Sequence, residues 1–233
     1  MAARQPLGPL GAAGPSPREA IGVLAGLVLL EVLAVALSSP WVGPSTADTV
    51  AFTGVLRLVD LVLCAAYWYG RGWSLSDLGL RGPRTWRGLS IGVLWALACG
   101  GAVGLVEVTL RLSAGVSFLR MLSASVPSRG HLALLLGVGG LVAPMFEEIV
   151  FRGILYGGLR KRLGTVTSTL AVSLLFATAH AMTTRIPIIQ AAGGVLFCAA
   201  YEVSGSLWAP LLLHAAGNAV LFSLPLALSL FGR

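Results

Sequence analysis

The strongest constraint on this chain is a succession of long apolar runs separated by short polar or basic stretches. The runs fall near residues 21–37, 49–69, 89–110, 131–162, 165–181, 186–203 and 206–224. A helix needs about 20 apolar residues to cross a bilayer core of roughly 30 Å. The runs lack the strict polar and apolar alternation of a membrane-spanning β-barrel. We therefore predict an all-α fold, a polytopic transmembrane helix bundle of seven or eight helices with an intramembrane polar cavity.

Composition supports a lipid environment. Of 233 residues, 56% are hydrophobic and only 11% are charged, whereas about a quarter of a soluble domain is charged. The net charge of +7 comes from basic residues dispersed through short loops, which is typical of membrane loops and not of a nucleic-acid surface. We expect membrane lipids as partners and no nucleic acid. Basic residues in alternate loops place the amino terminus in the cytoplasm, and we expect a multi-pass protein of a bacterial inner (cell) membrane.

The domain organisation follows from the same runs. Residues 1–18 are rich in Gly, Pro and Ala and are predicted to form a disordered tail. Residues 19–233 are predicted to form a single transmembrane helical domain, with a catalytic core at about 131–224. The first run fits an uncleaved helix better than a signal peptide, since many more spans follow. Residues 225–231 are too short to cross alone, so they extend the last helix or form a partial one.

Ionisable side chains inside the apolar runs identify candidate functional residues, because each is costly in lipid. Glu31, Asp60, Glu107 and Glu202 each stand alone in the sequence, which favours structural roles. The remaining ionisable residues form short clusters and are Glu147, Glu148, Arg152, His180 and His214.

The first cluster pairs two carboxylates with one arginine. Glu148 and Arg152 are four residues apart, so they lie one helical turn apart and can pair. Glu147 then points about 100° away around the helix, without a partner among its neighbours. An unpaired carboxylate in a low dielectric is suited to act as a general base or acid.

Two further clusters carry the histidines. His180 follows Phe176 by one turn, and Asn218 follows His214 by one turn. If Gly164 ends one helix, Glu147 lies about 25 Å before the turn and His180 about 24 Å after it. The helices therefore bring these side chains to the same depth, where we expect them to face one polar centre.

The order Glu-Glu-x-x-x-Arg, Phe-x-x-x-His and His-x-x-x-Asn on successive apolar runs resembles the CPBP family of intramembrane proteases. This is also called the Abi or CAAX protease family, and it includes the type II CAAX prenyl proteases. The resemblance covers about 144–220, and the loop Leu78-Gly79-Leu80-Arg81 is similar to that of bacterial members. It implies a catalytic set of Glu147, Glu148, Arg152, His180, His214 and Asn218. By resemblance, Glu147 and His180 activate a water, and His214 and Asn218 stabilise the oxyanion.

Several alternatives stay open from the sequence. His180, His214 and Glu147 could instead hold zinc, although Asn218 is a poor zinc ligand, so the cofactor is either none or Zn. The implied substrate is the carboxyl-terminal region of a membrane-associated or lipid-linked protein or peptide. A prenylated CAAX tail, a sorting signal and a bacteriocin precursor are all compatible. The alternative functions are a non-catalytic membrane immunity or scaffold protein and, less favoured, a small proton-coupled transporter.

Overall fold

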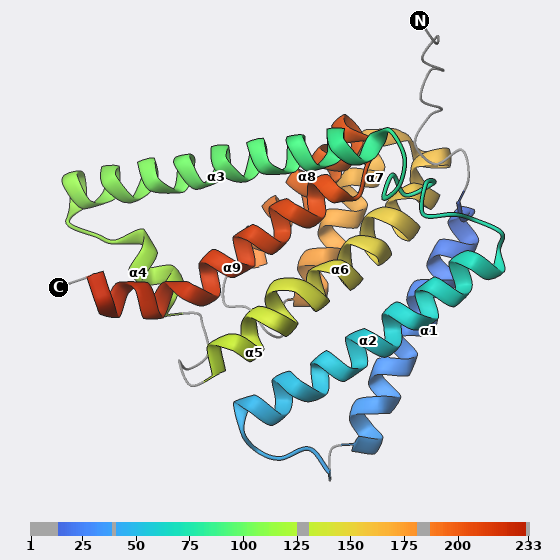
Figure 1. Ribbon diagram of the computed structural model, residues 1–233, viewed down its shortest axis with the longest axis horizontal. Coiled ribbons are helices and arrows are strands. Elements are labelled where there is room, and N and C mark those ends of the chain that lie inside the picture. The colour runs from blue at the N-terminus through green and yellow to red at the C-terminus, as the bar shows by residue number, and fades with distance from the viewer. Residues whose placement is uncertain (1–13, 39–40, 125–130, 181–186, 232–233) are drawn as a thin grey trace, which may run out of the picture.

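The computed structural model describes residues 14–38, 41–124, 131–180 and 187–231, and the regular elements within these ranges are all helical (Figure 1). The predicted all-α bundle is therefore confirmed. The elements are α1 (Pro17–Ser38), α2 (Thr46–Gly70), α3 (Arg84–Ala114), α4 (Phe118–Ser123), α5 (Leu132–Gly137), η2 (Val138–Val142), α6 (Ala143–Glu148), η3 (Ile149–Tyr156), α7 (Gly157–His180), α8 (Pro187–Ser204) and α9 (Trp208–Phe231), where η marks a π-helical segment.

Within the described ranges, 6 helices are long and apolar enough to cross a membrane. The longest, Leu132–His180, is broken at Gly164, whose φ of 74° and ψ of 176° are not helical. Glycine adopts this conformation without steric cost. The rings of Phe151 and Phe176, on either side of the break, lie 5.1 Å apart, so the chain reverses at Gly164 as predicted. The stretch therefore consists of two packed halves on either side of Gly164.

The rod that runs from α5 through η2 and α6 to η3 forms the centre of the bundle. It contacts α9 on one side and α2 on the other (Figure 1). Seven residues of η3, from Val150 to Tyr156, are buried. The outer helices instead expose apolar side chains, as Leu29 of α1 and Leu105 of α3 illustrate. This pattern places lipid outside and the polar residues inside, as in a multi-pass membrane protein.

Two π-helical segments, η2 and η3, flank the short helix α6 that carries both carboxylates. Pro144 of α6 has no backbone N–H, and its ring conflicts with the carbonyl four residues earlier in an α-helix. The wider η2 segment ends at Val142, two residues before Pro144, and accommodates the proline ring. Because π-helical turns are rare and occur frequently at functional sites, their position directs attention to Glu147 and Glu148.

The amino-terminal boundary differs from the prediction. Helix α1 begins at Pro17, inside the predicted tail of residues 1–18. Ser16 and Glu19 cap its first turn, because the Glu19 carboxylate accepts from the Ser16 N–H at 2.8 Å. Lys161 also donates to the Gly14 carbonyl at 2.7 Å. Residues 14–18 are thus part of the fold, while 1–13 lie outside the described residues.

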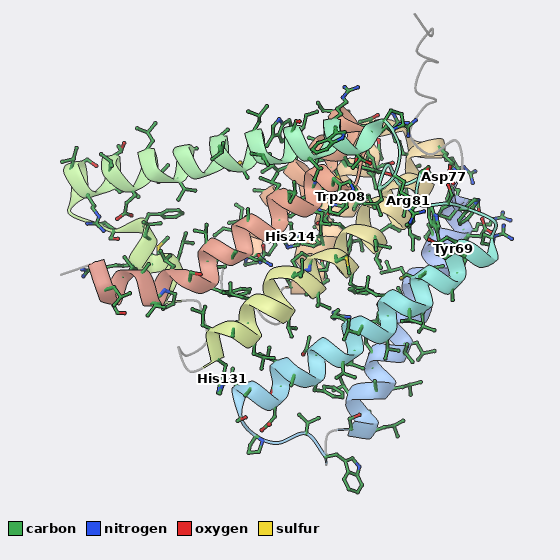
Figure 2. The ribbon with its side chains drawn as sticks, viewed as in Figure 1. Tyr69, Asp77, Arg81, His131, Trp208 and His214 are labelled. Atoms are coloured by element: carbon green, nitrogen blue, oxygen red, sulfur yellow. The ribbon has the colours of Figure 1, made fainter. Side chains whose placement is uncertain are left out.

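The loop between α2 and α3 fixes the start of α9, the helix that carries His214. The Ser206 hydroxyl donates to the Gly79 carbonyl at 2.6 Å, and the Trp208 indole donates to the Leu80 carbonyl at 3.1 Å. Figure 2 labels Trp208 at this junction and His214 further along the same helix. Helix α9 continues to Phe231, so residues 225–231 extend it.

Candidate active site

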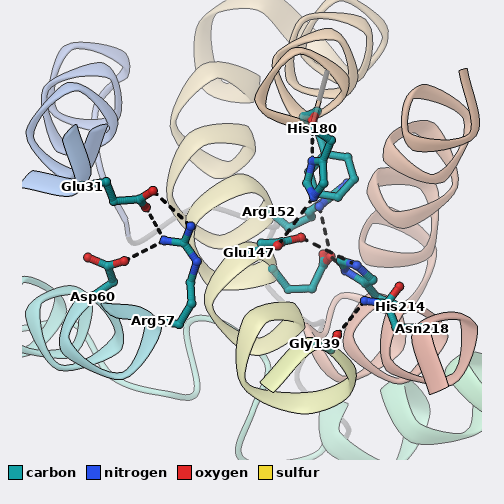
Figure 3. Close-up of polar contacts among 11 residues, drawn as sticks. Glu31, Arg57, Asp60, Gly139, Glu147, Arg152, His180, His214 and Asn218 are labelled. Atoms are coloured by element: carbon teal, nitrogen blue, oxygen red, sulfur yellow. Dashed lines mark hydrogen bonds and ion pairs between the residues drawn. The ribbon is translucent and has the colours of Figure 1, made fainter. Parts of the chain in front are cut away.

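The carboxylate of Glu147 lies between two imidazole rings that come from different helices (Figure 3). Its Oε1 is 3.7 Å from Nε2 of His180, and its Oε2 is 3.7 Å from Nε2 of His214. The Glu147 side chain exposes 15% of its surface and that of His214 exposes 8%. The structure thus brings α6, α7 and α9 together at one depth, as the distances along the helices predict.

The second nitrogen of each imidazole is held by a hydrogen-bond acceptor. Nδ1 of His180 lies 2.8 Å from the Phe176 carbonyl, and Nδ1 of His214 lies 2.8 Å from Oε1 of Glu148. Both acceptors require a proton on Nδ1, so in each neutral ring Nε2 presents a lone pair towards Glu147. Oε2 of Glu147 is buried and has no hydrogen-bond partner among the described residues. The centre therefore gathers acceptors around a position suited to a donor such as water.

A buried ion pair supports His214 from behind. Nη1 of Arg152 donates to Oε1 of Glu148 at 3.0 Å, and Nη2 donates to the Gly194 carbonyl at 3.3 Å. The predicted pairing of Glu148 with Arg152 is confirmed. The sequence did not reveal that the same carboxylate oxygen also holds His214. Arg152, Glu148 and His214 consequently form a chain that fixes the imidazole.

Two phenylalanine rings enclose the charged groups. The Arg152 guanidinium lies 4.7 Å from the Phe176 ring centroid and 5.0 Å from that of Phe197. The His214 ring stacks on Phe197 with centroids 4.6 Å apart, and the His180 ring lies 4.6 Å from that of Phe176. Such contacts stabilise cations and fix ring orientation. Sequence reasoning missed Phe197, because no spacing pattern in α8 distinguishes it from a core residue.

Asn218 lies one helical turn beyond His214 on α9, as predicted. Its Nδ2 donates to the Gly139 carbonyl of η2 at 2.8 Å (Figure 3). This bond uses one of the two carboxamide protons. Asn218 is therefore anchored to the central rod and keeps a second N–H.

Glu31 and Asp60, which stand alone in the sequence, have a common partner in the structure. Both form ion pairs with Arg57 of α2, and the Arg57–Asp60 distance is 2.8 Å (Figure 3). The Arg57 guanidinium also lies 4.5 Å from the Phe146 ring centroid. Arg57 escaped sequence reasoning, although its spacing of three residues from Asp60 on one helix was a usable signal. The structural role expected for Glu31 and Asp60 agrees with this pairing.

Glu107 and Glu202 are likewise occupied in structural contacts. Glu107 pairs with Arg111 and accepts from the Leu119 N–H at 2.8 Å, which fastens α4 to α3. Glu202 pairs with Arg160 across the end of α8 and the start of α7. These contacts agree with the structural roles expected for Glu107 and Glu202.

The predicted zinc ligands are Glu147, His180 and His214, and Glu147 lies 3.7 Å from Nε2 of each histidine. Within the described parts of the chain, no group of three or more His, Cys, Asp or Glu side chains is arranged to hold a metal ion. We derive no chemical step through zinc.

Comparison with known proteins bears directly on this site. Residues 129–220 match the family model described as type II CAAX prenyl endopeptidase Rce1-like, and this segment contains all six candidate residues. The predicted resemblance to the CAAX protease family is confirmed. The chain is also 26% identical over 141 residues to "Putative membrane peptidase YdiL" of Bacillus subtilis (strain 168). No solved structure matches the chain significantly.

These matches cover only part of each protein. The alignment with the Bacillus protein covers 56% of this chain and 55% of that protein, so the chain spans about half the length of the curated relative it matches. At the level of the family, both matches support an intramembrane protease. The apolar helices and the resemblance to this family together identify a multi-pass integral membrane protein.

Proposed function

We propose that this chain is an intramembrane endopeptidase that hydrolyses a peptide bond in the carboxyl-terminal region of a membrane-associated or lipid-linked protein or peptide. One observation carries the proposal. Glu147 lies 3.7 Å from Nε2 of both His180 and His214, and its buried Oε2 has no partner among the described residues. A water placed there can donate to Glu147 and to His180, leaving its oxygen lone pair for attack.

The proposed mechanism needs no metal. Glu147 takes a proton as the water oxygen bonds to the scissile carbonyl carbon, and His180 orients that water through Nε2. Protonated Glu147 then gives its proton to the amine nitrogen as the carbon–nitrogen bond breaks. The products are a carboxylic acid, which keeps the second proton of the water, and a free amine, so the catalytic groups return to their starting state.

The developing oxyanion is stabilised from α9 in this proposal. Asn218 retains one carboxamide N–H, and His214 donates from Nε2 when its ring is doubly protonated. Glu148 lies 2.8 Å from the opposite nitrogen of His214 and stabilises the imidazolium. Arg152 donates to that carboxylate at 3.0 Å and fixes its position. Glu148 and Arg152 are therefore positioning residues.

The test compares carboxyl-terminal peptides of membrane proteins by mass spectrometry in cells that express wild-type protein or Glu147→Gln. Uncut tails are expected to accumulate in the variant. The chain contains three histidines, and the third, His131, is exposed at the start of α5. His131→Gln is the matched control and should cleave normally. Identical peptide sets from wild-type and Glu147→Gln cells at equal protein levels would disprove the assigned base.

The same comparison separates an enzyme from an immunity or scaffold protein. In a scaffold, the polar cluster only joins helices, so substitutions at His180 and His214 should lower stability and leave tail processing unchanged. In the proposed protease, His180→Ala and His214→Ala should abolish processing while the detergent-solubilised proteins still elute as folded monodisperse species.

A further inference from the structure

The carbonyl of Gly139 is deprived of its usual partners within the central rod. In a regular α-helix it would accept the N–H of Ala143, but that N–H donates to the Val138 carbonyl. In a π-helix it would accept the N–H of residue 144, and residue 144 is a proline without an N–H. Pro144 and the η2 turn therefore leave this carbonyl free to bond outside the helix.

Asn218 forms a hydrogen bond with this free carbonyl of Gly139. Its Nδ2 lies 2.8 Å from the Gly139 oxygen, within hydrogen-bonding distance. Because a carbonyl oxygen carries no proton, only the nitrogen end of the carboxamide can face it. The bond thus fixes which way the amide points, and it excludes the flipped orientation that would turn Oδ1 to this side.

Gly139 also permits the close approach that this bond requires. A Cβ at position 139 would lie 2.7 Å from Cε2 of Phe222, which is on the same helix as Asn218. The absence of a side chain lets α9 pack directly on η2. Gly139 therefore provides both the close contact between η2 and α9 and the carbonyl that Asn218 binds.

We propose that Pro144 and Gly139 are positioning residues that orient the carboxamide of Asn218 for oxyanion stabilisation. Pro144 acts by withholding a backbone proton, and Gly139 acts by presenting the carbonyl so released. This inference rests on the proposed function for its catalytic consequence. The hydrogen bond that anchors the Asn218 carboxamide can be measured without any substrate.

Asn218 is the only asparagine in the 233-residue sequence, so a protein labelled with 15N at the asparagine side chain gives one carboxamide signal. In the wild-type protein in detergent micelles, one of its two protons should exchange slowly with solvent. In Pro144→Ala, η2 can relax to an α-helix in which Ala143 donates to Gly139, and both carboxamide protons should then exchange at similar rates. Two equally fast protons in the wild type would overturn the proposal before any variant is made.

Kinetics supply the second readout. Pro144→Ala should lower kcat about tenfold with KM unchanged, since the substrate still binds while the oxyanion donor is misoriented. In an Asn218→Ala background, Pro144→Ala should cause no further loss, because the two residues act as a unit. Pro225, which is also buried inside a helix, is the matched control, and Pro225→Ala should change neither kcat nor the carboxamide signal.

Two outcomes would overturn the inference. One is an unchanged Asn218 signal in Pro144→Ala, and the other is the same fold-loss of kcat in both backgrounds, which a general structural effect would give. If the wild-type protein cleaves no substrate but shows the protected carboxamide proton, the proposed function fails and the anchoring of Asn218 stands.

Discussion

Two partly buried charged clusters lie on opposite sides of the central rod (Figure 3). They differ in how well their hydrogen-bond donors and acceptors match. Around Arg57, a guanidinium faces the carboxylates of Glu31 and Asp60, so donors meet acceptors. Around Glu147, a carboxylate faces Nε2 atoms of two rings whose Nδ1 atoms are already held by acceptors. The first cluster is saturated, whereas the second is unsaturated, because the buried Oε2 of Glu147 has no partner among the described residues. The comparison supports the proposal that the unsaturated cluster performs the chemistry.

The difference has an energetic basis. Polar groups inside a membrane are costly unless they pair, so a bundle keeps an unsaturated group only where another molecule completes it. Arg57 additionally lies against the Phe146 ring, next to Glu147 in the sequence. The saturated cluster thereby joins α1 and α2 to the rod that carries the unsaturated one.

The largest expected effect is the loss of turnover in Glu147→Gln. The amide preserves side-chain shape but cannot take a proton from water, so kcat should fall on the order of 10³-fold. The measurement is cleavage of a carboxyl-terminal peptide by purified protein in lipid nanodiscs, with an unchanged melting temperature as evidence of folding. If the variant kept full activity, Glu147 would not be the base that activates the water.

Arg57→Met should break the saturated cluster and lower stability without removing the chemistry. It leaves Glu31 and Asp60 without their cation, which should lower the free energy of unfolding by about 3 kcal/mol. Thermal unfolding in detergent measures the loss, and the folded fraction should keep its kcat.

The triple variant Glu31→Gln, Arg57→Met, Asp60→Asn is the control for this cluster. It removes all three charges together, so it should recover most of the lost stability. A triple variant that is stable but inactive would place the Arg57 cluster in the catalytic machinery and contradict the comparison.

A smaller effect is expected from Glu148→Gln. The amide oxygen can still accept from one neighbour, but the negative charge that stabilises a protonated His214 is lost, so kcat should fall roughly 10²-fold. The separate measurement of kcat and KM distinguishes this from general damage, since kcat should fall while KM and the melting temperature stay constant. An unchanged kcat would refute the role assigned to Glu148.

The smallest effect is expected from metal removal. Because the proposed water is activated by side chains alone, incubation with a chelator should change kcat by less than about twofold, within the context dependence of such measurements. Loss of activity that returns on addition of zinc would show that Glu147, His180 and His214 bind metal and would replace the proposed mechanism.

Helical spacing and membrane thickness made much of this arrangement predictable. Both are fixed by backbone geometry, so the turn at Gly164 and the common depth of Glu147 and His180 followed from residue counts alone. The Glu148–Arg152 pair followed in the same way from its spacing of one turn.

The features that sequence reasoning missed depend on contacts between distant segments. The bond from His214 to Glu148 spans 66 residues, and that from Asn218 to Gly139 spans 79. Phe197 and Arg57 likewise obtain their surroundings from other helices. Neither propensity nor periodicity reports which faces of two helices meet, and π-helical turns shift those faces further.

The π-helical segment η3 has a consequence for how this protein tolerates insertions and deletions. Its wide turns accommodate an additional residue relative to an α-helix. Removing one residue from Ile149–Tyr156 would let the rod close into a regular helix without interrupting it. Because a π-helical turn holds about one residue more than an α-helical turn, the two ends of the rod would keep nearly the same orientation relative to each other. A one-residue deletion in the regular helix α9 between Trp208 and His214 has no wide turn to absorb it and would rotate His214 by about 100° away from Glu147. We therefore expect η3 to tolerate a shortening that the helix carrying His214 does not.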